Sequence, residues 1–239
     1  MAEGIKLSEG RFVHALALGL DAAWRRLPAE ERCQTAEEFV AAIRKESEVT
    51  THSYSMVGLQ QGADLLLWSL GPTLEAIEER SAMALRSGMG KWMSVNESFL
   101  GVIQPSQYVK KPTPQEQSLF SGERSRYLVV YPFTKSAEWY QLPSEERQRI
   151  MNGHMKVGHA FPEVRQLLAY SFGLDDMDFL VAYETDDLPK FGELVRALRG
   201  TESRLSTVRD TPILTGIHRP IEEITEILGA KDAATKSEM

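Results

Sequence analysis

The sequence has a single cysteine and no long run of apolar residues. Cys33 cannot form a disulfide within the chain, and zinc ribbons and CxxC redox motifs are excluded because they need paired cysteines. The longest apolar runs, such as 65–68 and 128–131, are far shorter than the roughly 20 residues of a membrane-spanning helix. The apolar stretch near the N-terminus is short and broken by His14, so we predict no secretory signal and expect a reducing, cytoplasmic location.

Positive charge is also scarce. The 27 basic residues are outnumbered by 34 acidic ones, and the formal charge of −7 disfavours a global role in binding nucleic acid or an anionic membrane. The sequence contains no GxGxxG, Walker, GxSxG or EF-hand motif. With 42% apolar residues among 239, the chain is expected to fold into one large or two ordinary domains.

An internal repeat favours two domains. The segment WRRLPAEER at 24–32 returns as WYQLPSEER at 139–147, with six of nine letters identical and an offset of 115 residues. At the same offset Gly58 corresponds to Gly173, and FLGV at 99–102 faces LTGI at 214–217. The chain is therefore predicted to contain two copies of one structural unit.

Each copy is predicted to have the order β-α-β-β-α-β. In the second copy, Ser144 is expected to cap a helix that continues to about residue 157, and Asp187 opens a helix that stops at Gly200. The fold class is α+β, with two tandem ferredoxin-like domains of the dimeric α/β barrel type whose sheets are joined within one subunit. We predict an N-terminal domain at 10–108, a linker at 109–126 and a C-terminal domain at 127–230.

Polar residues of the second copy that replace apolar or smaller residues of the first indicate a site. His154 corresponds to Phe39 and Tyr131 corresponds to Leu16. By the same offset, Lys135 replaces Leu20 and Gln166 replaces Thr51. A scaffold that served only structure would keep similar residue types in both copies, so we expect the second copy to carry the functional site.

His154 takes a position that is apolar in the first copy, so its imidazole is expected to point inward. It is either a buried histidine satisfied by one hydrogen bond or an axial ligand of a metal or haem. His159 does not complete a two-histidine metal site, because zinc pairs on a helix are spaced i, i+4. Glu202 is either a surface residue or the acceptor for the second imidazole nitrogen of His154.

Tyr131 and Lys135 enclose the motif YPFTK at the end of a predicted strand. They are either an ordinary strand tyrosine and a solvated lysine or a site for a carboxylate, since a phenol and an ammonium both donate hydrogen bonds. Only the phenol is readily oxidised, so a radical relay is chemically available. Trp139 is repeated as Trp24 and is also expected in the core.

Three segments together carry a resemblance to a known family. They are RYLVVYPFTKSAEWYQLPSEERQRIMNGHMKVG, YSFGLDDMDFLVAYETDD and TPILTGI. They resemble the chlorite dismutase and coproheme decarboxylase superfamily, and the likeness extends from about residue 12 to 228. The resemblance implies one iron porphyrin in the C-terminal domain, held by His154 with Glu202 behind it, and a homopentamer of subunits.

Two positions favour the coproheme decarboxylase branch. Gln166 stands where chlorite dismutases keep an arginine, and Tyr131 matches the redox-active tyrosine of the decarboxylases. The resemblance implies Tyr131 and Lys135 as catalytic residues. The cofactor-binding residues that it implies are Tyr131, Pro132, Phe133, Thr134, Lys135, Trp139, His154, Gln166 and Arg126.

The predicted function is peroxide-dependent oxidative decarboxylation of two propionates of Fe-coproporphyrin III to vinyl groups, which gives haem b. Iron porphyrin and hydrogen peroxide are the predicted partners, and no nucleic acid or membrane span is expected. The alternatives are a haem-binding or haem-sensing protein without turnover and a chlorite dismutase.

Overall fold

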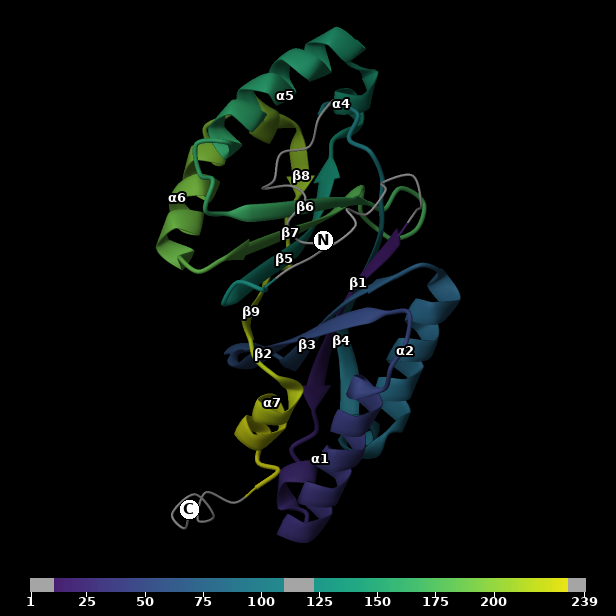
Figure 1. Ribbon diagram of the computed structural model, residues 1–239. Helices are drawn as coiled ribbons and strands as arrows, with labels where there is room; N and C mark the ends of the chain where they lie inside the picture. Colours follow the sequence, from purple (N-terminus) through teal and green to yellow (C-terminus); the bar gives the residue numbers. More distant parts are fainter. Residues whose placement is uncertain (1–10, 110–122, 232–239) are drawn as a thin grey trace. The chain divides into compact units, whose positions relative to one another are not determined.

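The computed structural model of the chain describes residues 11–109 and 123–231, which form two compact units (Figure 1). The N-terminal unit consists of Arg11–Phe99 and the described residues from Gly216 onward, and the C-terminal unit consists of the described part of Leu100–Thr215. Most of the predicted linker 109–126 lies outside the described residues.

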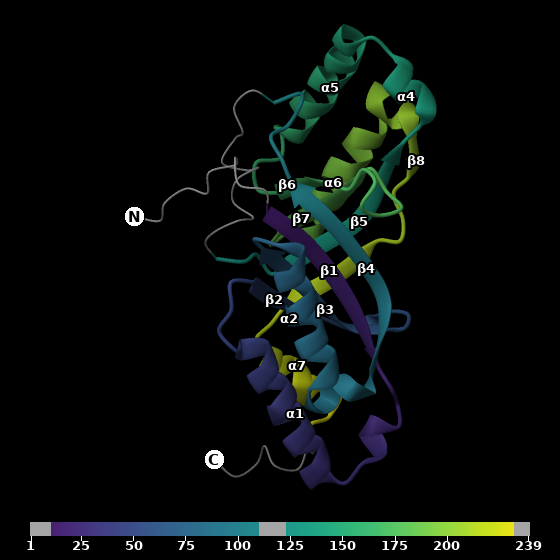
Figure 2. The same ribbon diagram turned by 90° about the vertical axis from the view of Figure 1, so that its right-hand side faces the viewer.

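The N-terminal unit has a sheet in which β3 lies between β1 and β2 and is antiparallel to both. Helices α1 and α2 lie side by side in this unit (Figure 2). Its elements are β1 (Arg11–Leu20), η1 (Trp24–Arg26), α1 (Ala29–Arg44), β2 (Thr50–Gln60), β3 (Ala63–Gly71), α2 (Leu74–Arg86), η2 (Gly88–Trp92), β4 (Met93–Ile103) and α7 (Ile221–Leu228).

The C-terminal unit has the same arrangement, with β7 between β5 and β6 and antiparallel to both. Helices α5 and α6 lie side by side on this unit (Figures 1 and 2). Its elements are β5 (Tyr127–Lys135), α4 (Ala137–Gln141), α5 (Ser144–Gly158), β6 (Arg165–Tyr170), β7 (Phe179–Thr185), α6 (Leu188–Arg199), η4 (Glu202–Ser206), β8 (Thr207–Arg209) and β9 (Leu214–His218).

Hydrogen bonds at equivalent places support the internal repeat. The backbone N–H of Leu20 donates to Asp64 Oδ2 over 2.9 Å, and the backbone N–H of Lys135 donates to Asp178 Oδ2 over 2.7 Å. Both bonds join the last residue of the unit's first strand to an aspartate near the start of the central strand, at the second residue of β3 or just before β7. The turn glycines match as well, because Gly58 and Gly173 have φ values of 72° and 71°, which side chains other than glycine rarely adopt.

The helix ends follow local sequence. Pro143 occupies the N-cap of α5 in an extended conformation, and Glu145 and Glu146 in the first turn complement the helix dipole. The prediction that Ser144 caps this helix is wrong, since Ser144 is already the first helical residue and no side-chain cap bond forms. Helix α6 is capped as predicted, by Asp187 accepting from the backbone N–H of Lys190 and by Gly200 at its end.

The fold is α+β, with two tandem ferredoxin-like units, as predicted. Strands β4 and β9 each contain residues of both units. The C-terminal domain was expected at 127–230, but the residues from Gly216 onward belong to the N-terminal unit. Ile217 and His218 lie next to β2, and α7 adds Ile224 and Leu228 to the N-terminal core.

Candidate functional site

The polar candidates occupy positions that form apolar core in the N-terminal unit. Leu16, Leu20, Trp24 and Phe39 all belong to one buried hydrophobic cluster there. The residues 115 positions later are Tyr131, Lys135, Trp139 and His154. Because the elements of the two units match, these four side chains are carried by equivalent places on the first strand, the segment after it and the first long helix of the C-terminal unit.

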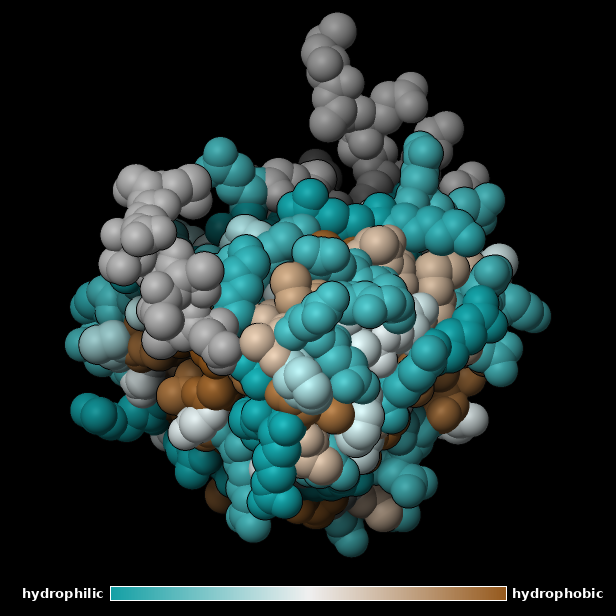
Figure 3. Space-filling model, turned by 90° about the horizontal axis from the view of Figure 1, so that it is seen from below, coloured by the Kyte–Doolittle hydropathy of each residue, from teal (hydrophilic) through white to brown (hydrophobic). Residues whose placement is uncertain are grey.

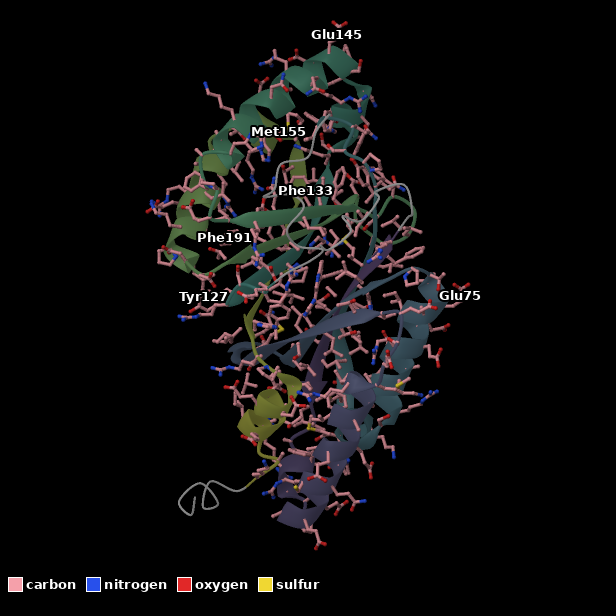
Figure 4. The ribbon with its side chains drawn as sticks, viewed as in Figure 1. Glu75, Tyr127, Phe133, Glu145, Met155 and Phe191 are labelled. Atoms are coloured by element: carbon pink, nitrogen blue, oxygen red, sulfur yellow. The ribbon has the colours of Figure 1, made fainter. Side chains whose placement is uncertain are left out.

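One face of the C-terminal sheet gathers several of the predicted residues. Directly opposed residues of antiparallel strands share a face, and alternate residues along one strand return to it. The register pairs Tyr131 with Val181 and Gln166 with Tyr183, so all four lie on this face. Phe191 of α6 packs against Tyr183 with ring centroids 5.2 Å apart, so α6 covers part of the face (Figure 4).

Tyr131 lies half-buried on β5 beside a second tyrosine. Its ring stacks on that of Tyr183, with centroids 6.2 Å apart and an interplanar angle of 26°. Burial raises the pKa of the Tyr131 hydroxyl well above its usual value, and the neighbouring Tyr183 phenol acts in the same direction. The phenol is therefore protonated at every physiological pH.

Lys135 is buried, with 7% of its surface exposed. Its Nζ donates to the carbonyl oxygen of Ser203 over 2.6 Å and lies 2.8 Å from Ser203 Oγ, while the Trp139 ring centroid is 4.4 Å away. Burial, followed by the charge of Arg204, lowers the pKa of the ammonium to about 8. Lys135 is therefore not the solvated surface lysine of the simpler interpretation.

His154 lies on α5 and is half-buried. Its Nδ1 is buried and has no hydrogen-bond partner among the described residues. Burial, followed by the charge of Lys135, lowers the pKa of the imidazole to about 4. At neutral pH the ring is uncharged, which is the form that binds metals.

Glu202 is not brought to His154 in this structure. Its Oε1 accepts a hydrogen bond from Arg149 over 2.7 Å, and Arg149 also binds Glu146. The side chain of Glu202 is 48% exposed. The predicted contact between Glu202 and His154 Nδ1 is therefore absent from the described residues, and Glu202 has the surface position of the alternative interpretation.

The remaining predicted residues differ in their surroundings. Pro132 is buried within β5, and the Phe133 ring lies 6.3 Å from that of Phe179. Thr134 Oγ1 is buried without a hydrogen-bond partner among the described residues. Arg126 is exposed, where its backbone N–H donates to Asp186 and its guanidinium lies 6.0 Å from the Tyr127 ring centroid.

Two residues of the site were missed by the sequence reasoning. Tyr183 could have been found from the alternation of side chains along FLVAYET. This strand lies next to the strand that carries Tyr131, and the alternation predicts which of its residues share one face of the sheet. Ser203 gave no signal, because its contact with Lys135 joins residues 68 positions apart.

The described residues fit a porphyrin-bound metal better than a metal ion held by side chains alone. They contain no group of three or more histidine, cysteine, aspartate or glutamate residues that could hold an ion. A neutral imidazole with an unsatisfied ring nitrogen fits single-histidine ligation of haem iron. Leu168, on the same sheet face opposite Val181, is 44% exposed and offers apolar surface to a flat ring.

Comparison with known proteins identifies the family. A model of the chlorite dismutase family matches residues 29–219, so the chain belongs to this family. This confirms the resemblance predicted from the sequence and supports a haem-binding, chlorite dismutase-like function. The family includes oxidoreductases such as coproheme decarboxylase and chlorite dismutase.

Individual relatives come from both branches. The coproheme decarboxylase of Mycolicibacterium smegmatis is 28% identical over 200 residues, which make up 82% of this chain and 85% of that protein. A mutant chlorite dismutase from Candidatus Nitrospira defluvii in complex with cyanide superposes with a TM-score of 0.86 at 29% identity, covering 97% of this chain and 100% of that chain. The chlorite dismutase of that organism in complex with imidazole gives a TM-score of 0.83 at 29% identity, covering 92% and 95%.

No helix within the described residues has the length and apolar character needed to cross a membrane. The face shown in Figure 3 is mostly hydrophilic, with hydrophobic patches that are small and separated.

Proposed function

We propose that this protein is a coproheme decarboxylase that converts two propionates of Fe-coproporphyrin III to vinyl groups with hydrogen peroxide. The observation that carries the proposal is the protonated, half-buried phenol of Tyr131 in the same unit as the neutral imidazole of His154. A phenol is the readily oxidised side chain that this chemistry requires. The coproheme decarboxylase relative at 28% identity gives further support.

The balance of each step is simple. One propionic acid side chain and one hydrogen peroxide give one vinyl group, one carbon dioxide and two waters. The iron of the bound substrate, together with peroxide, supplies the oxidising power. Tyr131 gives up its hydroxyl hydrogen atom and then takes one from the propionate carbon next to the ring carbon. The carboxylate then leaves as carbon dioxide, and the second electron passes to the oxidised iron of the substrate.

His154 would hold the substrate iron through a ring nitrogen, and its low pKa keeps that nitrogen free of a proton at neutral pH. Gln166 would offer an amide to a ligand on the iron without adding positive charge. Pro132, Phe133 and Thr134 lie between the two catalytic residues in the YPFTK motif, and the Trp139 ring lies 4.4 Å from Lys135 Nζ. All four are proposed to bind the porphyrin. Arg126, at the start of β5, is proposed to contact a propionate at the rim of the site.

Lys135 is proposed to attract a propionate of the tetracarboxylate substrate. Its ammonium is a buried positive charge, and its two recorded oxygen contacts are both neutral oxygens of Ser203. A carboxylate that replaced one of these contacts would form a stronger, charge-assisted hydrogen bond.

The test is mass spectrometry of the porphyrin after ferric coproporphyrin III is mixed with the protein and titrated with peroxide. Two successive losses of the elements of formic acid are expected, and the Tyr131→Phe variant should bind the substrate but give no loss. Oxygen release from chlorite with an unchanged porphyrin would assign the protein to the chlorite dismutases. Binding without either reaction would make it a haem-binding or haem-sensing protein.

Several broader expectations stay predictions. They are the homopentamer, the cytoplasmic location and the use of peroxide as physiological oxidant. The division into domains at 10–108 and 127–230 with a linker at 109–126 also stays a proposal.

A further inference from the structure

Tyr140, on the short helix α4, forms a hydrogen bond with a carboxylate that also binds the YPFTK motif. Its hydroxyl donates to Asp178 Oδ2 over 2.6 Å, a length typical of a hydroxyl that donates to a carboxylate. The same carboxylate oxygen accepts the backbone N–H of Lys135 over 2.7 Å. Asp178 therefore joins Tyr140 to the motif that carries the two proposed catalytic residues.

The N-terminal unit has a different partner for the equivalent carboxylate. There Asp64 Oδ2 accepts the backbone N–H of Leu20, and Arg25 Nη2 lies 3.7 Å from Asp64 Oδ1. Arg25 precedes Tyr140 by 115 residues, so a phenol replaces a guanidinium at the same place in the repeat. The two side chains differ in chemistry, because only the phenol can lose one electron while it passes its proton to a carboxylate.

Aromatic rings in contact lead from Tyr140 to the sheet face that carries Tyr131. The Tyr140 ring lies 5.7 Å from the Phe172 ring, and the Phe172 ring lies 5.1 Å from that of Phe179. Phe179 is directly opposite Phe133 in the sheet, with centroids 6.3 Å apart. Phe133 follows Tyr131 by two residues on β5, so these two side chains share a face. The three centroid distances are those of packed aromatic pairs.

The outer end of this aromatic path is open to solvent. Tyr140 and Phe172 are 39% and 48% exposed, whereas Tyr131 is half-buried. Burial of its hydroxyl, followed by the bond with Asp178, raises the pKa of Tyr140, so the phenol keeps its proton until it is oxidised. Small reductants in solution, such as ascorbate or a thiol, can approach the Tyr140 ring directly.

We propose that Tyr140 is an outlet for surplus oxidising equivalents, which reach it from Tyr131 when no propionate is in place to react. This inference rests on the proposed function, in which Tyr131 is oxidised. The Tyr140 phenol gives its electron to the site and its proton to Asp178. A reductant in solution then restores Tyr140, so the site returns to its resting state without damage to the porphyrin or the protein.

The exchange is balanced in atoms and electrons. The Tyr131 phenoxyl takes up one electron from Tyr140 and one proton from water, and becomes a phenol again. The Tyr140 O–H bond breaks as its proton moves to the Asp178 carboxylate. In the second step ascorbate or a thiolate supplies one electron to the Tyr140 phenoxyl, and Asp178 returns the proton. Because both carriers are phenols, the first step is close to neutral in energy, and the carboxylate favours the Tyr140 side.

The first experiment needs neither porphyrin nor peroxide. A photo-oxidised ruthenium tris-bipyridyl complex removes one electron from the cofactor-free protein, and electron paramagnetic resonance measures the phenoxyl yield. Tyr140→Phe should remove most of the signal, whereas Tyr127→Phe is the matched control, since the Tyr127 ring contacts the Arg126 guanidinium instead. Asp178→Asn should lower the yield about tenfold, the change expected for one hydrogen bond to a charged group, because an amide cannot take the proton. A wild-type yield in either variant would overturn the redox pair.

The second experiment examines the loaded protein after both propionates have reacted. More peroxide is added with a nitroso spin trap, and peptide mass spectrometry locates the label, which is expected on Tyr140 and should disappear with ascorbate. Tyr140→Phe should form vinyl product as wild type does but lose porphyrin absorbance faster with each addition of peroxide. Circular dichroism verifies that the variant is folded. Equal loss of absorbance in both proteins, or a label on Tyr140 that persists in Tyr131→Phe, would refute the outlet.

The two proposals fail in different ways. If wild type forms no vinyl product, the decarboxylase function fails and the outlet fails with it, while oxidation of the cofactor-free protein still decides whether Tyr140 and Asp178 form a redox pair. If wild type forms product but carries no label on Tyr140, only the outlet is lost.

Discussion

The two units share a scaffold but use the space between sheet and first helix differently. In the N-terminal unit this space is closed by apolar side chains, with Phe39 fully buried. In the C-terminal unit the corresponding residues are a phenol, an ammonium and an imidazole, and His154 Nδ1 has no hydrogen-bond partner among the described residues. In a duplicated fold, one copy can thus keep a closely packed apolar core, while the other carries polar residues of a functional site at the same positions.

The short helix after the second long helix shows the same contrast. In the N-terminal unit Gly88 packs so tightly on α1 that a Cβ atom there would come within 2.0 Å of the Thr35 carbonyl oxygen. In the C-terminal unit the equivalent residue is Ser203, whose Oγ lies 3.8 Å from Met151 Sδ on α5 and also contacts Lys135. A side chain at this position keeps η4 from approaching α5 as closely as η2 approaches α1.

The largest expected effect is on binding. His154→Ala should abolish tight binding of ferric coproporphyrin, because it removes the only nitrogen ligand proposed for the iron. A Soret titration measures this, with His159→Ala as the control on the same segment. A wild-type titration curve for His154→Ala would refute the ligand assignment.

The next effect compares equivalent helix positions. Phe39→Ala should lower the free energy of unfolding by about 3–5 kcal/mol, since it empties a fully buried site. His154→Phe in the cofactor-free protein should instead raise it by about 1 kcal/mol, because it removes a buried nitrogen without a partner. Urea unfolding of both variants tests the difference, and destabilisation by His154→Phe would contradict it.

A pH dependence follows from His154. Its pKa is about 4 in the folded protein and about 6.5 when unfolded, so the unfolded chain binds more protons between these values. Stability of the cofactor-free protein should therefore rise from pH 4 to pH 6.5, by about 3 kcal/mol from this residue. His154→Phe should flatten the profile measured by urea unfolding; an unchanged slope would assign the effect to other groups.

A smaller effect is expected at Lys135. Lys135→Leu recreates the residue of the N-terminal unit at the same place, Leu20, and should weaken ferric coproporphyrin binding about tenfold through loss of one charge-assisted hydrogen bond. An iron porphyrin with two carboxylates should lose less affinity than the tetracarboxylate. Equal losses for the two ligands would indicate that Lys135 acts on the fold of the site rather than on a propionate.

The smallest effect is expected on the surface. Arg149→Ala breaks the exposed pairs with Glu146 and Glu202, and such pairs contribute little to stability. The thermal midpoint of the cofactor-free protein should not change measurably. A clear drop would show that η4 depends on Arg149 as well as on Lys135.

Much of the fold could be predicted from the sequence because the signals were local. The repeat of WxxLPxEER and the two turn glycines located matching elements in both halves, and Asp187 and Gly200 marked the ends of α6. The boundary at 216 could not be predicted, since β9 and α7 join the N-terminal unit through contacts with residues more than 150 positions earlier.

The candidate site could also be predicted in part, from a comparison of the two halves of the sequence. Comparison of the halves singled out Tyr131, Lys135 and His154, because each replaces an apolar residue of the first copy. The partners of these residues could not be inferred. The contacts of Tyr131 with Tyr183 and of Lys135 with Ser203 join segments more than 50 residues apart.

By itself, the sequence determined the duplicated α+β architecture, the family and the half of the chain that bears unusual polar residues, since these depend on short-range pattern and on comparison of one half with the other. Only the tertiary structure decided which way those residues face and what they touch. In the folded protein the Lys135 ammonium donates to Ser203, Arg149 donates to Glu202, and the Tyr131 ring stacks on that of Tyr183. Side-chain partners depend on strand register and helix packing, and these are settled only when the whole unit folds.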